Sequence, residues 1–121
     1  MRVLRKKLPP DVLYIGPRRV RFGAAAVELL QLTDYKSCDI YLLDDGFEVK
    51  FRKDKDGMRA LNFGKVRNSI WCDIFLRTVI KNEGWPTGHF YFRVLQPDTI
   101  RVSLKEPALG LAPVKKQEVN V

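Results

Sequence analysis

The sequence predicts a mixed α+β single domain, in which two tandem β-α-β-β units form a small β-barrel. Three observations favour this fold. The length of 121 residues suits one domain. The composition, 45% hydrophobic and 30% charged, is typical of a globular chain. The same order of predicted elements occurs twice, starting at Val20 and again at Ile70.

The chain begins with a basic N-terminal arm, residues 1–10. It contains Arg2, Arg5, Lys6 and Lys7 and ends in two prolines. Proline removes a backbone donor and disfavours helix just before it, so we expect an extended arm. Two interpretations remain open: an arm that follows phosphates, or a solvated terminus.

The first unit spans residues 11–56. Residues 11–15 form a short β-prone run. Alternation after it puts Val20 and Phe22 on one face of a strand, and Arg19 and Arg21 together on the opposite, water-facing side.

A short helix follows Gly23, with an apolar stripe at i, i+3 and i+4: Ala26, Leu29 and Leu30. Two strands, 38–43 and 47–51, come next. Asp44-Asp45-Gly46 between them predicts a tight hairpin, because Asp-Gly tolerates positive φ values.

The second unit spans residues 57–105 and begins with a strand candidate at 59–63. We expect a helix over residues 71–81, with a buried stripe of Leu76, Val79 and Ile80, ending at Gly84. Strands at 89–95 and 99–104 close the unit. Residues 106–121 lack periodicity, so we expect them to form a mobile tail.

The two units match element by element. The two helix stripes align without a gap, and Phe47, Val49 and Phe51 align with Ile100, Val102 and Leu104. Neither unit can bury its apolar faces alone. Packing them about a pseudo-two-fold axis hides both faces and closes a barrel, as a homodimer would.

The net charge of +8, from 22 Lys and Arg against 14 Asp and Glu, favours an anionic partner. Nucleic acid comes first and an acidic membrane surface second. Basic residues gather in corresponding stretches of the two units, Arg18, Arg19 and Arg21 in one and Lys65 and Arg67 in the other. A pseudo-two-fold barrel is expected to place both stretches on one side. A secondary basic group, Lys50, Arg52 and Lys53, is interpreted as an ordinary outer strand face and turn.

The first unit also resembles a known family. Arg19-Val20-Arg21-Phe22, the helical Glu28-Leu29-Leu30-Gln31-Leu32 and the strand–turn–strand at 39–50 carry the resemblance. Together they are similar to the AbrB/SpoVT family of swapped-hairpin barrels, and the second unit looks like a diverged copy, as in its MraZ-like tandem members. The resemblance implies binding of double-stranded DNA, as a transcription regulator or accessory factor. It assigns that role to the basic loop at Arg18, Arg19 and Arg21, and by weaker correspondence to Lys65 and Arg67.

Two other functions stay open. The barrel could be a scaffold for protein–protein interaction, as in antitoxin-like and phage accessory proteins, with a homodimer or a larger protein as partner. It could also bind single-stranded nucleic acid on exposed aromatic residues. Phe90 and Phe92 share one face of a strand with Tyr91 on the other, and Trp71 and Trp85 flank the second predicted helix. The other interpretation of these rings is packing in the core or at the helix edge.

Catalytic and metal-binding classes find little support. His89 is the only histidine, and no nucleophile elbow or glycine-rich phosphate loop occurs. Cys38 and Cys72 are isolated and stand among apolar residues, which predicts small buried side chains. We therefore expect no enzyme activity, cofactor or metal site. No apolar run reaches the length of a membrane span, so we expect a cytoplasmic protein.

Overall fold

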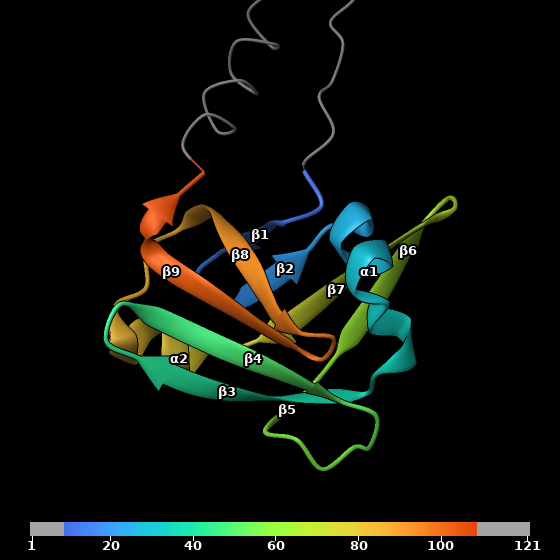
Figure 1. Cartoon of the computed structure of the whole chain (residues 1–121), viewed down its shortest axis with the longest axis horizontal. Helices are drawn as coiled ribbons and strands as arrows, with labels where there is room; N and C mark the ends of the chain where they lie inside the picture. The colour runs from blue at the N-terminus through green and yellow to red at the C-terminus, as the bar shows by residue number, and fades with distance from the viewer. Residues whose placement is uncertain (1–8, 109–121) are drawn as a thin grey trace, which may run out of the picture.

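The computed structural model describes residues 9–108 as one antiparallel nine-stranded sheet, curled into a nearly closed barrel (Figure 1). The predicted small α+β barrel is therefore confirmed at this level. In chain order the elements are β1 (Val12–Ile15), β2 (Arg19–Phe22), α1 (Ala24–Leu30), a 3-10 turn η1 (Leu32–Asp34), β3 (Ser37–Leu43), β4 (Gly46–Arg52), β5 (Arg59–Ala60), β6 (Asn62–Val66), β7 (Ser69–Phe75), α2 (Arg77–Glu83), β8 (Gly88–Gln96) and β9 (Thr99–Pro107).

One bent segment brings the two ends of the sheet together. The strand order is β5-β3-β4-β9-β8-β1-β2-β7-β6, and β5 and β6 are consecutive in the chain. β5 pairs with β3, and the amide of Leu61 continues that pairing to the carbonyl of Lys36 at 3.0 Å. β6 then pairs with β7 on the other side. The free edge of β6 leaves the barrel incompletely closed.

The core lies inside the barrel and follows the alternation of apolar residues in the strands. Phe22 is central, with its ring edge-on to Phe51 at 5.9 Å and to Phe92 at 6.0 Å. Val20 and Phe22 point inward, as predicted. Phe90 and Phe92 are also buried in the core. Burying these faces against one another supplies the main favourable term in folding.

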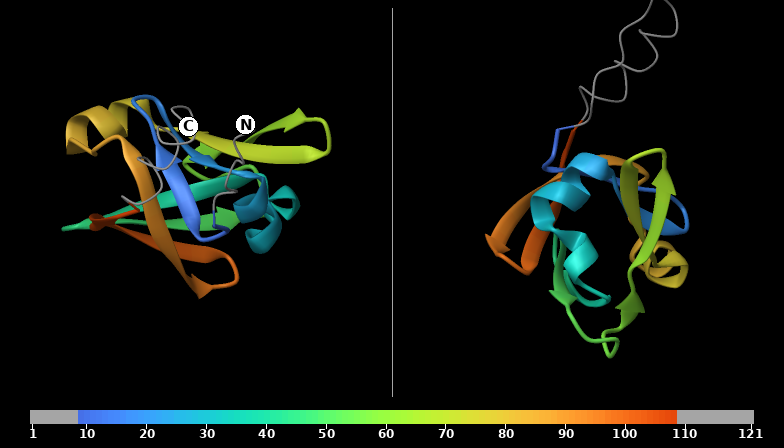
Figure 2. Two further views of the ribbon diagram at one scale, coloured as in Figure 1. Left: turned by 90° about the horizontal axis from the view of Figure 1, so that it is seen from above. Right: turned by 90° about the vertical axis from the view of Figure 1, so that its right-hand side faces the viewer.

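Two short helices lie at opposite ends of the barrel (Figures 1 and 2). α1 buries Ala26, Val27 and Leu30. The predicted stripe was wrong at Leu29, which is 51% exposed, because the barrel contacts the neighbouring side of the helix. α2 ends at Gly84 in the left-handed conformation (φ 66°), which confirms the predicted stop.

The helix expected over residues 71–81 was wrong in its first half. Residues Ser69–Phe75 form β7, and the helix begins only at Arg77. Cys72 and Ile74 point into the barrel, while their neighbours along the strand face outward. Residues 69–75 thus follow the inward–outward alternation of a strand. The i, i+3, i+4 spacing of a helix applies only from Leu76 onward.

The hairpin predicted at Asp44-Asp45-Gly46 is confirmed, but the reason for its glycine differs. The glycines with positive φ among the described residues are Gly84 and Gly88, so Gly46 needs no special conformation. It pairs with Ser103, and a Cβ at this position would lie 1.9 Å from the carbonyl oxygen of Val102. Gly46 therefore permits close approach of β4 and β9.

The last strand continues past the expected end of the second unit. β9 runs to Pro107, and the amide of Ala108 donates to the carbonyl of His89 at 2.8 Å. The rest of the predicted tail and most of the predicted basic arm, residues 109–121 and 1–8, lie outside the described residues. Among the helices in the described range, none has the length and apolar character needed to cross a membrane.

Candidate nucleic-acid interface

Arg19 and Arg21 lie on the outer face of β2, in the β2–β7 ladder. The register puts Arg21 opposite Asp73 and Arg19 opposite Phe75. The predicted outward orientation of both arginines is confirmed. However, they belong to a strand rather than to a loop, so the flanking side chains of β7 determine their positions.

Asp73 holds both arginines. Arg21 donates through its Nε to Oδ1 at 2.7 Å and through a terminal nitrogen to Oδ2 at 2.8 Å, and Arg19 donates to Oδ2 at 3.2 Å. The Asp73 side chain is 1% exposed, whereas those of Arg19 and Arg21 are 38% and 39% exposed. The hydrogen bonds to Asp73 raise the pKa of the Arg21 guanidinium. One buried carboxylate thus fixes two half-exposed cations and leaves one net positive charge.

Two aromatic rings flank this ion cluster. The Arg21 guanidinium lies over the ring of Trp71 at 4.4 Å, and that of Arg19 over Phe75 at 5.4 Å. A Cβ on Gly64 would fall 1.8 Å from the Trp71 ring, so the ring packs flat against the neighbouring strand. Cation–π contact and the carboxylate together restrain the guanidinium planes.

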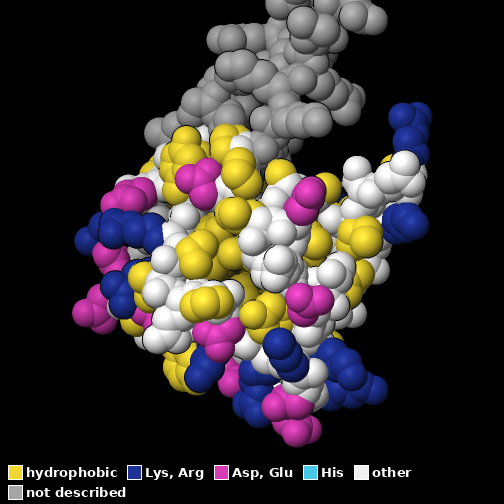
Figure 3. Space-filling model, turned by 45° about the vertical axis from the view of Figure 1, so that its right-hand side comes forward, with side chains coloured by type: hydrophobic (Ala, Val, Ile, Leu, Met, Phe, Trp, Pro, Cys, Tyr) yellow, Lys and Arg dark blue, Asp and Glu magenta, His cyan; other side chains and the backbone are white. Residues whose placement is uncertain are grey.

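The remaining predicted basic residues lie at the two ends of this ladder. Arg18 is exposed in the β1–β2 turn, and its carbonyl oxygen accepts a hydrogen bond from the amide of Leu76 at 2.9 Å. Lys65 and Arg67 are exposed on the projecting β6–β7 hairpin, where Figure 3 shows basic side chains. The six residue steps of β7 separate the two turns by roughly 20 Å. The two basic stretches therefore lie at opposite ends of the β2–β7 ladder, because β2 and β7 run antiparallel.

We call the outer surface that joins these ends the basic strip. It comprises Arg18, Arg19, Arg21 and Arg67, with the rings of Trp71 and Phe75 between them. Sequence reasoning missed the partners supplied by β7. Alternation through Trp71, Asp73 and Phe75 was the signal that placed all three on one face.

In the secondary basic group, two carboxylates neutralise Arg52. Arg52 forms ion pairs with Asp39 at 3.1 Å and with Asp54 at 3.0 Å. Lys50 and Lys53 are exposed on β4 and in the loop after it. Basic and acidic side chains alternate along the lower edge of Figure 3, consistent with the predicted ordinary surface.

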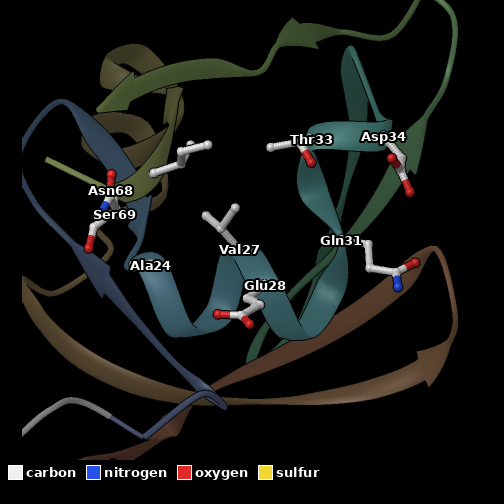
Figure 4. Close-up of a pocket in the computed structure, with 9 residues that line it drawn as sticks. Ala24, Val27, Glu28, Gln31, Thr33, Asp34, Asn68 and Ser69 are labelled. Atoms are coloured by element: carbon white, nitrogen blue, oxygen red, sulfur yellow. The ribbon is translucent and has the colours of Figure 1, made fainter. Parts of the chain in front are cut away.

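A hollow of about 590 Å³ separates α1 from the β6–β7 hairpin (Figure 4). Val27 and Ile70 supply apolar lining, and polar side chains supply the remainder. Its charged lining residues are Glu28 and Asp34, both acidic. The hollow therefore does not extend the basic strip, and its charge repels a phosphate chain from that side.

The strip has the chemistry of a surface for anionic, planar ligands: fixed guanidinium groups next to aromatic rings. Within residues 9–108, no three His, Cys, Asp or Glu side chains are grouped so as to hold a metal ion. In comparisons with protein-family models, curated proteins and solved structures, the chain matches none. Its function is therefore inferred from the strip itself.

Proposed function

We propose that this protein binds nucleic acid through the basic strip. The observation that carries the proposal is the single row in which Trp71, Arg21, Arg19 and Phe75 lie around one buried carboxylate. Guanidinium groups contact phosphates and aromatic rings stack on bases, so the row offers both kinds of contact. Arg18 and Arg67 extend the positive charge to either end.

The charge distribution along the chain supports this proposal. Residues 9–108 contain 16 Lys and Arg against 13 Asp and Glu, and residues 1–8 contain four basic residues and no acid. Much of the net charge of +8 therefore lies in the sequence outside the barrel. The barrel itself is nearly balanced, so a local row of cations, rather than bulk charge, is its contribution to binding.

The resemblance to the AbrB/SpoVT family adds a more specific form of the proposal: a DNA-binding regulator or accessory factor built from tandem units. The pattern of strand pairing supports the tandem origin. In the exchange, β1, β2, β3 and β4 take the places of β6, β7, β8 and β9, in that order. The β1–β2 pair then becomes the β6–β7 pair, and the β3–β4 pair becomes the β8–β9 pair. The same exchange leaves the β2–β7 and β4–β9 pairs unchanged, as a pseudo-two-fold axis requires.

Interchangeable units make a testable prediction. Residues 1–56 expressed alone should self-associate into a folded dimer, with a second copy supplying the missing pairs. Sedimentation and circular dichroism measure this. A monomeric, unfolded fragment counts against interchangeable units.

A protein–protein interaction module is the second candidate, favoured by exposed apolar residues on another face. Tyr41 (52% exposed) and Leu95 (46% exposed) line one shallow surface with Lys50 and Glu48 between them. If this face is the functional one, Tyr41→Ser should abolish self-association or partner capture. The nucleic-acid affinity should be the same in that variant.

Anisotropy titration of labelled DNA with the full chain tests the main proposal. Binding should persist at about 150 mM salt and weaken steeply as salt increases, because counterions are released from contacted phosphates. Binding that disappears between low and physiological salt would instead show incidental attraction to a basic chain. In that case the strip has no nucleic-acid function.

A further inference from the structure

We infer that the preferred ligand of the basic strip is single-stranded rather than duplex nucleic acid, with bases stacked on Phe75 and on the guanidinium of Arg21. This inference rests on the proposed function and specifies its ligand. It starts from the orientation of the side chains in the strip, since double and single strands present different groups to a protein. A duplex offers phosphates and groove edges, whereas a single strand also offers base faces.

The arginines of the strip are held as flat surfaces rather than as extended phosphate ligands. Arg21 uses its Nε and a terminal nitrogen on Asp73 and lies against the Trp71 ring. The guanidinium face opposite Trp71 is therefore left for a ligand, backed by an aromatic ring. Such planes stack on unpaired bases, as aromatic side chains do.

Phe75 provides the second stacking surface. It is 46% exposed at the end of β7, the next-to-last strand of the sheet, and Arg19 covers it only in part. Exposure of a large aromatic ring is unfavourable in water, so a ligand that covers it gains free energy. Phe75 lies two residues along β7 from Asp73, the partner of Arg21, which separates the two surfaces by roughly 7 Å.

The strip carries little of what duplex recognition needs. Duplex DNA presents one negative charge for each ~1.7 Å of its axis. Asp73 offsets one of the two central arginines, and the remaining cations are distributed to the ends. The two helices, α1 and α2, have seven residues each and contribute no residue to the strip.

The test compares two labelled DNAs with the full chain at about 150 mM salt. One is a thymidine oligomer of about 15 nucleotides, and the other is a duplex of the same length. Single-strand binding should be tighter. Phe75→Ala should weaken it about 5- to 160-fold, the effect of losing one stacked base. Tyr41→Ala is the matched control, since Tyr41 is an equally exposed aromatic residue on β3, away from the strip.

The outcomes separate this inference from the proposed function. Binding of neither DNA would overturn both. Tighter duplex binding that Phe75→Ala leaves unchanged would overturn the inference alone. Loss of that duplex binding in Lys65→Ala/Arg67→Asn would then assign it to the β6–β7 hairpin. Equal losses in Phe75→Ala and Tyr41→Ala would remove the strip as the site of single-strand binding.

Discussion

Asp73 of β7 lies directly opposite Arg21 of β2 and accepts two hydrogen bonds from its guanidinium, at 2.7 and 2.8 Å. This is the central ion pair of the basic strip, and it restrains the cation that the proposed function needs. Because Asp73 also pairs with Arg19, one side chain controls the charge and the position of both arginines.

The first prediction concerns that control. Asp73→Asn keeps the side-chain size, removes the negative charge and releases both arginines toward a ligand. Nucleic-acid affinity should rise. The slope of log K against log salt should steepen by about 0.7 to 0.9 units, which is the contribution of one additional phosphate contact. Asp44→Asn makes the same charge change in the exposed β3–β4 turn. Equal gains in the two variants would show a general charge effect instead.

Removing the arginine should instead destabilise the barrel. Arg21→Ala leaves the buried Asp73 carboxylate without its two-pronged partner, which costs about 1–3 kcal/mol of unfolding free energy. Urea unfolding measures this cost. In the Asp73→Asn background the same substitution should cost less, and the difference gives the coupling energy of the pair. If the cost is the same in both backgrounds, the pair does not stabilise the fold.

Gly64 is predicted to be intolerant of a side chain. In Gly64→Ala the new methyl group would occupy the position of the Trp71 ring, so the ring must move away from β6 and from Arg21. We expect about 1–3 kcal/mol of destabilisation together with weaker nucleic-acid binding. Gly23→Ala is the control, because no atom lies within 4 Å of its Cβ position. Comparable losses in the two variants would argue against a specific role for this packing.

The two cysteines should be unreactive in the folded protein. Both are free and buried, and burial raises the pKa of each thiol from 9.0 to about 12. The folded state therefore favours neutral thiols, so this stabilisation is complete below pH 9 and lost as the pH rises toward 12. Ellman's reagent at pH 8 should label neither thiol in the folded protein and both in urea. Rapid labelling without denaturant would contradict the buried placement.

Alternation in the sequence was sufficient to predict most of the barrel. Val20 and Phe22 point inward as predicted, and Phe90 and Phe92 share one strand face as predicted, which is the inner one. The turn at Gly46 and the helix end at Gly84 were also located correctly. These features depend on short-range patterns, which a single sequence contains in full.

The candidate site was less predictable, because its partners are distant in sequence. Arg21 and Asp73 come together only when β2 and β7 pair. Residues 71–75 were expected to belong to the helix at 71–81, so strand β7 and its pairing were not predicted. Trp71 and Phe75 were misplaced for the same reason. Long-range strand pairing, rather than local propensity, decides which residues meet across a barrel.

The most direct test of the central claim is the salt dependence of nucleic-acid binding in Arg18→Ala/Arg67→Asn. These arginines lie at the two ends of the strip, and both are exposed. Asparagine suits the positive φ of 58° at residue 67. The account predicts that the salt slope becomes shallower by about 1.4 to 1.8 units, two lost phosphate contacts. Lys50→Ala/Lys53→Ala, with the same charge change elsewhere on the barrel, should leave the slope near the wild-type value. An unchanged slope in the first variant, or an equal change in both, would contradict binding along the strip.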